Sequence, residues 1–153
     1  MTIAKSKRIT TVKLAVLIFT TIIVIAFFFP FDRTIVPPWR FQVVDESGHP
    51  MANMPVCQIW RHYSVEDTDH EEDSITDQNG FVEFPRRTIR VSQFQIIKGA
   101  ISNFLQYSIH ASYGPSSFII VLAGDDYINN GYYKKGWKLP SRIVVRPLHP
   151  KKV

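Results

Sequence analysis

The sequence predicts a mainly β chain: an antiparallel, immunoglobulin-like sandwich of about seven strands with one short helix, behind one N-terminal transmembrane helix. Three observations predict this fold class. An 18-residue run without charge follows a short basic tail. Most of the remaining sequence alternates apolar and polar residues in short stretches between turn residues, which is typical of antiparallel strands. One stretch instead repeats its apolar residues at three- and four-residue steps, which is the spacing of a helix.

The uncharged run extends from Leu14 to Phe31, LAVLIFTTIIVIAFFFPF. At about 1.5 Å per helical residue it would be about 27 Å long, close to the thickness of the hydrocarbon core of a bilayer. We therefore expect a basic tail over 1–13, a transmembrane helix over 14–31 and a linker over 32–38. A cleaved signal peptide is the alternative, but the run exceeds the usual ~7–15 apolar residues and no small-x-small cleavage site follows it.

The charge distribution predicts an orientation. The 153 residues carry 18 Lys and Arg, 13 Asp and Glu and a formal net charge of +5, and residues 1–31 hold four of the bases and no acid. Positive charge before an apolar helix keeps that end in the cytoplasm. The expected location is the bacterial inner membrane, with the N-terminus cytoplasmic and the C-terminal domain periplasmic or otherwise extracytoplasmic. A nucleic-acid partner is disfavoured, because the exported part is close to neutral.

The exported domain is expected over 39–148, with a tail over 149–153. Its first strand alternates from Trp39 to Val44, and Gly48 supplies a positive φ for the turn that follows. The other extended stretches expected are Val56–Tyr63, Ser74–Thr76, Phe81–Phe84, Thr88–Ser92, Tyr107–Ser112, Phe118–Leu122 and Arg142–Val145.

The segments between these stretches have different expected structures. Glu66–Asp73 is acidic and lacks apolar residues, so it is expected to be a solvated loop. Asn79-Gly80 suits a tight hairpin turn. The helical repeat runs from Phe94 to Leu105 despite Gly99. Gly124–Gly136 is polar and rich in turn residues, and a long hairpin loop is expected there.

The stretch from Phe41 to Phe84 resembles the carboxypeptidase regulatory-like family of transthyretin-like (prealbumin-type) sandwiches. The likeness is carried by FQVVDESGHPMANMPV, by SITDQNGFVEF and by the spacing between them. The residues at the family's positions are Asp45, Gly48, Pro50, Val56, Thr76, Asp77, Gly80 and Phe81. The resemblance implies a prealbumin-like sandwich of about seven strands that serves folding, adhesion or interaction. It brings no catalytic residue: the related hydrolases end in Tyr-Arg-Gly-Ser, whereas this chain ends in RPLHPKKV.

Residues that could carry chemistry are few. Cys57, the one cysteine, lies in an apolar strand pattern, so a buried and inert thiol is expected. The histidines lack the spacing of a helical zinc site and are expected at the surface or in turns. They are His49, His62, His70, His110 and His149. We therefore expect no catalytic residue, no cofactor and no metal.

The acidic loop is a weak calcium candidate, because it places hard oxygen ligands at alternate positions. The residues concerned are Asp67, Asp69, Glu71 and Asp73. An EF-hand needs glycine at the sixth position and glutamate at the twelfth, and this loop has neither. A solvated loop without metal is therefore the preferred interpretation.

A mixture of aromatic and basic residues near the C-terminus is a candidate interaction surface. It consists of Tyr132, Tyr133, Lys134, Lys135, Trp137 and Lys138. Such a mixture suits polysaccharide, single-stranded nucleic acid or anionic lipid headgroups. The alternative is an exposed basic edge that prevents one sheet from pairing with another.

The sequence thus predicts a single-pass, membrane-anchored envelope protein whose exported β-sandwich acts as a non-catalytic interaction or structural module. The expected partners are membrane lipid, through Leu14 to Phe31, and an envelope protein. The alternatives are a small envelope enzyme of the hydrolase type, which would use Cys57 or a histidine, and an immunity-like protein.

Overall fold

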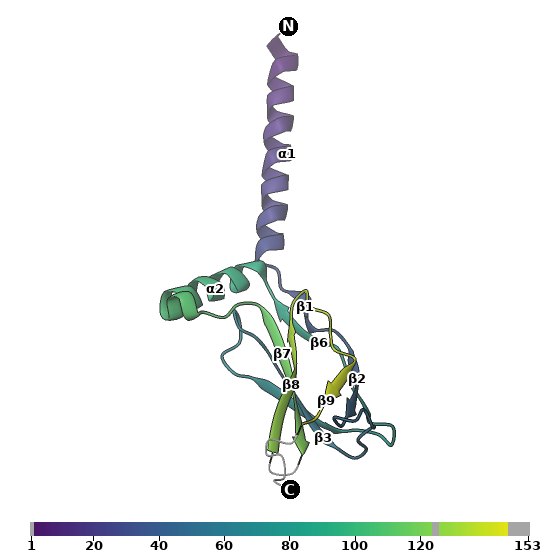
Figure 1. The fold of residues 1–153 in the computed structure, drawn as a ribbon. Helices are drawn as coiled ribbons and strands as arrows, with labels where there is room; N and C mark the ends of the chain where they lie inside the picture. Colours follow the sequence, from purple (N-terminus) through teal and green to yellow (C-terminus); the bar gives the residue numbers. More distant parts are fainter. Residues whose placement is uncertain (1, 124–125, 147–153) are drawn as a thin grey trace.

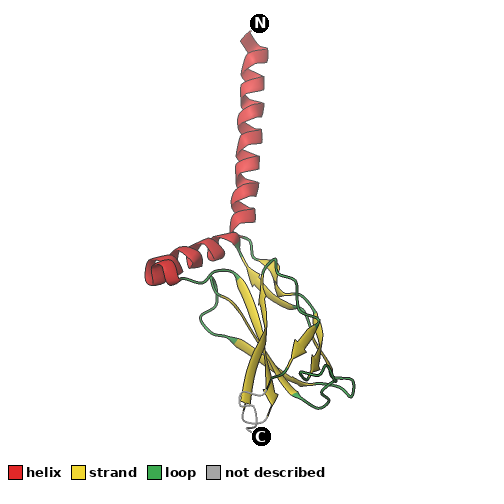
Figure 2. Cartoon of the chain, viewed as in Figure 1, coloured by secondary structure: helices red, strands yellow, loops and turns green. Residues whose placement is uncertain are grey.

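The chain folds into a long helix that stands on a mainly β body, with a second helix at the junction (Figures 1 and 2). The computed structural model describes the backbone of residues 2–123 and 126–146, and the side chains of residues 12–122 and 131–146. The elements are α1 (Thr2–Phe28), β1 (Phe31–Val36), β2 (Trp39–Val44), β3 (Pro55–His62), β4 (His70–Ile75), β5 (Phe81–Phe84), β6 (Arg87–Val91), α2 (Gln93–Tyr107), the 3-10 turn η1 (Ser108–His110), β7 (Pro115–Ala123), β8 (Asp126–Lys134) and β9 (Arg142–Val144).

The nine described strands form three sheets. β1 pairs with β6, the order of the three-stranded sheet is β5-β2-β9, and the order of the four-stranded sheet is β4-β3-β7-β8. The pairing of β2 with β9 is parallel and the others are antiparallel. The strand count therefore exceeds the expected seven or so, but the mainly β class is confirmed.

The core lies between the two larger sheets. The alternation predicted from Trp39 to Val44 is confirmed, since the side chains of Trp39, Phe41 and Val43 are all buried. They pack with residues of the four-stranded sheet such as Ile119 and Val121 in one cluster. Two sheets that share one core have the layered arrangement of a sandwich.

Several expected boundaries are wrong. Most of the expected linker over 32–38 belongs to β1, which pairs with β6 and buries its last residues, Ile35 and Val36. Tyr107–Ser112 is not a strand, because α2 continues to Tyr107 and η1 follows. The loop expected over Gly124–Gly136 contains β8. Residues 124–125, and the expected tail over 149–153, lie outside the described residues.

The segments around β4 also differ from expectation. The acidic stretch is a loop only as far as Asp69, because β4 begins at His70 and pairs with β3. The turn at Asn79-Gly80 does not close a hairpin: β4 pairs with β3, whereas β5 pairs with β2. The turn instead carries the chain from one sheet to the other. Gly80 has φ +75°, and a Cβ there would lie 2.7 Å from the carbonyl oxygen of Val43, so the turn requires glycine.

The predicted helix from Phe94 is confirmed as α2. A capping box begins it: the Ser92 hydroxyl accepts from the Gln95 backbone N–H at 3.2 Å, and the Gln95 side chain accepts from the Ser92 N–H at 2.9 Å. Together these two bonds satisfy donors that a helix start leaves without partners.

Helix α1 differs from the transmembrane helix expected over 14–31. It begins at Thr2 and ends at Phe28, just before Pro30, whose ring cannot continue the helical hydrogen bonds. The described part of the chain contains no helix that is both long enough and apolar enough to cross a membrane.

Candidate functional site

Several unusual surface features meet at the end of the body that adjoins α1. α2 lies across this end, at the foot of α1 (Figures 1 and 2). The strand register brings His62 of β3 opposite Pro115 of β7, and Lys134 of β8 opposite Ser116. We call this surface, formed by α2 and these strand ends, the helical end.

The polar and small residues of α2 hold it on the body. A Cβ at Gly99 would lie 1.5 Å from the carbonyl oxygen of Ser64, so only glycine allows the helix to come this close. The side-chain amide of Asn103 donates to the carbonyl oxygen of Tyr63 at 2.6 Å. The contact face of α2 is therefore not its apolar face.

The apolar face of α2 is uncovered. None of its residues is buried, and Ile101 and Leu105 are 55% and 77% exposed. Phe94 of this face reaches α1, with its ring centroid 4.9 Å from that of Phe28 and 6.2 Å from that of Phe27. The apolar surfaces of the two helices therefore adjoin each other.

Apart from Lys13, Thr20 and Thr21, the described side chains of α1 are apolar, and they surround the helix. Its large apolar residues other than Phe27 are about half exposed or more, for example Val12 at 62% and Phe28 at 54%. Amphipathic surface helices concentrate such residues on one face, whereas helices that are apolar all round are enclosed by protein or by lipid.

The expected aromatic and basic surface is divided by the strand alternation of β8. Tyr133 points into the core, so it cannot belong to an outer surface. Tyr132 lies outside, where its ring packs edge-on against Trp137 at 5.9 Å and its hydroxyl accepts a 3.2 Å hydrogen bond from Ser116. Lys134, Lys135 and Lys138 are exposed beside them, at the helical end.

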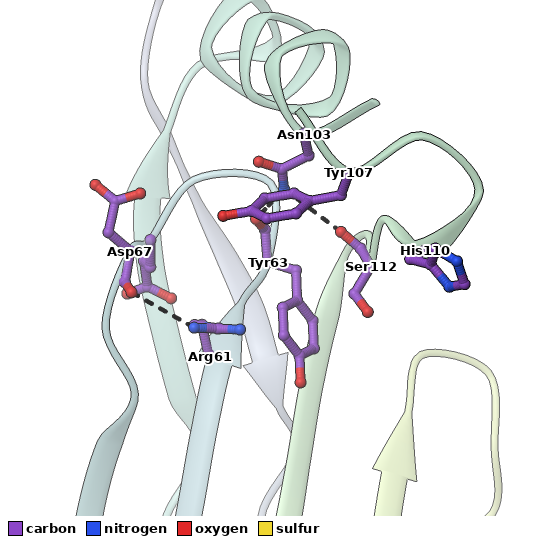
Figure 3. A pocket seen from close by; sticks show the side chains of 8 residues that line it. Arg61, Tyr63, Asp67, Asn103, Tyr107, His110 and Ser112 are labelled. Atoms are coloured by element: carbon purple, nitrogen blue, oxygen red, sulfur yellow. Dashed lines mark hydrogen bonds between the residues drawn. The ribbon is translucent and has the colours of Figure 1, made fainter. Parts of the chain in front are cut away.

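A polar pocket of about 240 Å³ lies between β3 and the C-terminal part of α2 (Figure 3). The acceptors of its hydrogen bonds are backbone carbonyl oxygens: Arg61 donates to that of Asp67, and Asn103 donates to those of Tyr63 and Ser112. These bonds join the loop after β3 to α2. The pocket also contains His110, but no described residue forms the hydrogen bond that would orient it as a catalytic base.

The acidic candidates for a metal site engage separate partners. Asp69 forms an ion pair with Arg61 at 3.3 Å, and the intervening Glu72 pairs with Arg87 at 2.8 Å. Glu71 and Asp73 lie on β4, opposite Ile59 and Cys57 of β3. Among the described residues, no three His, Cys, Asp or Glu side chains come together as a metal site would require.

Cys57 is partly buried rather than fully enclosed. Burial, followed by the hydrogen bond with Asp73 and the negative charges of Asp73 and Glu71, raises the pKa of its thiol to about 11. A catalytic cysteine needs the opposite surroundings, with a cation or a histidine that lowers the pKa.

His62 is the histidine whose predicted position is wrong. It was expected at the surface or in a turn, but only 6% of it is exposed. It lines a second pocket, under α2, together with Arg33 and Lys135. No local pattern connects these three residues, because β1, β3 and the turn after β8 are brought together only by the fold. His149 lies outside the described residues.

No protein-family model, no curated protein and no solved structure matches this chain.

Proposed function

We propose that this chain is a single-pass, membrane-anchored envelope protein whose β-sandwich serves as a non-catalytic interaction or structural module. The observation that carries the proposal is the joined apolar surface of α1 and α2, which meet at Phe28 and Phe94. Apolar surface exposed to water costs about 25 cal/mol per Å² relative to an apolar surrounding. A lipid bilayer would cover the apolar surfaces of both helices together.

The proposed anchor is the whole segment Leu14–Phe31, not the helix alone. Phe29 and Phe31 continue the apolar surface beyond the end of α1, with ring centroids 5.1 Å apart. At the other end, the long side chain of Lys13 can extend toward the headgroups while its methylenes stay in lipid. The four bases that precede Leu14 favour a cytoplasmic N-terminus and an exported body.

In this arrangement α2 lies in the membrane interface. Its polar face holds the body through Asn103, its apolar face is uncovered, and it crosses the foot of the anchor. Interfacial helices have this division of faces. Trp137 and Lys138 lie at the same end of the body, and aromatic and basic side chains are favoured at the level of the headgroups.

The prealbumin-like identity of the sandwich is part of the proposal. Its support is that the residues of the resemblance have the structural roles that such turns need. Asp77 accepts hydrogen bonds from the backbone N–H groups of Asn79 and Phe81, both at 2.8 Å. Asp45 accepts from the N–H of His49 at 2.8 Å, and Gly48 has φ +85°.

The alternative of a small hydrolase has less support. Its best nucleophile would be Cys57, but a thiol with a pKa of about 11 is almost entirely protonated at neutral pH. An immunity-like role is a special case of the interaction module, and no feature of the surface favours it.

Membrane fractionation combined with a topology reporter tests the proposal. We expect the full chain, expressed in a bacterium, to stay in the membrane pellet after alkaline carbonate extraction. Alkaline phosphatase fused after Val153 should be active, and a reporter that works only in the cytoplasm should be inactive at the same position. A chain that is released by carbonate, or that activates the cytoplasmic reporter, would contradict the proposal.

A further inference from the structure

The pocket under α2 is the larger of the two described above, with a volume of about 680 Å³. β1, the end of β3, α2, the start of β7 and the turn after β8 all contribute to its wall. The basic side chains in this wall are Arg33, His62 and Lys135, Tyr113 adds a phenol, and none of its described lining residues is Asp or Glu. The pocket therefore has positive charge without a counter-charge of its own.

His62 presents a buried ring nitrogen to this region. The residue is 6% exposed, and its Nδ1 has no hydrogen-bond partner. The carboxylate of Glu66 does not bind this ring nitrogen. It accepts from the backbone N–H of His62 at 2.6 Å and contacts Nε2 of His70 at 2.8 Å. A buried polar atom without a partner costs about 1–3 kcal/mol, which a ligand that bonds to it can recover.

The guanidinium of Arg33 is held in position, but one of its N–H donors has no hydrogen-bond partner. Its Nη2 donates to the side-chain oxygen of Gln93 at 2.9 Å, which fixes the guanidinium against the first turn of α2. Its Nε is buried and has no partner. Guanidinium groups bind phosphate and carboxylate oxygens through two parallel N–H donors, so a fixed guanidinium with a free N–H is suited to an oxyanion.

Burial lowers the pKa of His62, and the positive charges of Arg33 and Lys135 act in the same direction, while the backbone of His62 itself and the charge of Glu66 oppose them. These surroundings favour the neutral ring, which carries one proton. With that proton on Nδ1, His62 can donate to an anion without adding a buried charge.

We propose that this pocket binds a phosphate group, supplied either by a lipid headgroup or by a soluble phosphate compound. The phosphate would accept from Nε of Arg33 and Nδ1 of His62 and would form an ion pair with Lys135 at the surface. One tetrahedral anion thus satisfies both unpaired donors and balances the charge of the site. The volume accommodates more than a bare phosphate, so a phosphorylated headgroup or small metabolite is the class of ligand that fits.

Calorimetric titration of the full chain in a neutral, phosphate-free detergent tests the site. The probes are inorganic phosphate and glycerol 3-phosphate. Lys135→Ala should weaken binding roughly tenfold, because it removes one charge-assisted contact. Lys138→Ala is the matched control: it removes the same charge from the same turn but does not line the pocket, and it should bind like the parent chain.

A second pair of variants addresses the buried donors. Arg33→Gln and His62→Gln should each weaken phosphate binding by at least about tenfold. Near-ultraviolet circular dichroism shows whether each variant remains folded. Since Lys135 is exposed, its variant keeps the test valid even if a buried substitution prevents folding.

Nanodiscs distinguish the two sources of phosphate. The same variants are compared in discs of phosphatidylcholine alone and in discs that also contain phosphatidic acid, with a spin-labelled phosphatidic acid as the reporter of binding. If Lys135→Ala weakens the binding of the soluble phosphates, the ligand is a soluble phosphate compound. If only phosphatidic acid binds, and Lys135→Ala weakens that binding, the ligand is a lipid headgroup. Equal behaviour of the Lys135 and Lys138 variants in both arms would overturn the proposal. The titration in detergent needs no bilayer. A negative result there would contradict the phosphate site without bearing on the proposed membrane anchor.

Discussion

Thr76 joins the two turns of the sandwich by a pair of buried hydrogen bonds. Its hydroxyl donates to the carbonyl oxygen of Met51 at 2.7 Å and accepts from the N–H of Met54 at 2.9 Å. Thr76→Val keeps the shape but removes both bonds, and it should lower the free energy of unfolding by about 2 kcal/mol. Urea denaturation in detergent measures this loss. Thr88→Val, at an exposed position of β6, should have little effect, and equal losses in the two variants would contradict this role of the hydroxyl.

Cys57 should react slowly with alkylating reagents at neutral pH. Only the thiolate reacts, and with a pKa of about 11 the thiolate fraction at pH 8 is about one in a thousand. The rate of alkylation by iodoacetamide should therefore rise about tenfold per pH unit between pH 7 and pH 10, since the thiolate fraction does.

Asp73 provides a way to separate the causes of this raised pKa. Its hydrogen bond and its charge both raise the pKa of Cys57, although burial is the larger cause. Asp73→Asn should therefore lower the pKa and speed alkylation several-fold at pH 8. Asp69→Asn removes the same charge from a residue that pairs with Arg61, so its rate should match that of the parent chain. A rate that is independent of pH near neutrality would show that the thiol is already ionised.

At the scale of an element, α2 depends on one glycine for its position. A Cβ at Gly99 would overlap the carbonyl oxygen of Ser64, which lies in a loop and cannot retreat without moving the end of β3. Gly99→Ala favours the helix itself but should lift it from the body. Hydrogen exchange should then speed up across α2 and change little in β2 and β3. Ser102→Ala, on an exposed part of the same helix, is the control, and unchanged exchange in Gly99→Ala would disprove the close contact.

Elements with a local side-chain period could be predicted from the sequence, whereas elements fixed by distant contacts could not. β2 and α2 were predicted because alternation and helical spacing are visible in the sequence. β8 was not, because Asn130-Gly131 reads as a turn. Gly131 is instead required by packing: a Cβ there would lie 3.0 Å from Cδ1 of Ile143 and 3.2 Å from Cβ of Ile119. The ladder also shifts register at Ile119/Ile120, which no short pattern predicts.

The pocket under α2 could not be predicted for the same reason. Arg33, His62 and Lys135 belong to three separate strands or turns, and each taken alone reads as an ordinary charged or polar residue. The aromatic and basic stretch was recognised as a unit, but strand alternation directs Tyr133 inward and Tyr132 outward. Sequence composition identified this region, and only the fold shows which of its side chains share a surface.

At the scale of the whole molecule, the connection between α1 and the β body is short. α1 ends at Phe28, β1 begins at Phe31, and β1 is paired along its length with β6. The body therefore follows α1 without a long linker, and α2 packs against the foot of α1 through Phe94. If α1 lies in lipid, the helical end must face the bilayer and the far end of the sandwich must face away.

This orientation can be measured with single fluorescent labels in a Cys57→Ser background. Phe104→Cys places a label on the apolar face of α2, and Ile75→Cys places one where β4 pairs with Pro55, at the opposite end of β3 from His62. In proteoliposomes, lipids that carry a quencher just below the headgroup should quench the label at 104 strongly and the label at 75 hardly at all. Aqueous iodide should show the reverse order, because the far end of the sandwich is in water. Both native residues are exposed, so the labels should not disturb the core. Equal quenching at the two positions by either agent would mean that the helical end does not face the bilayer.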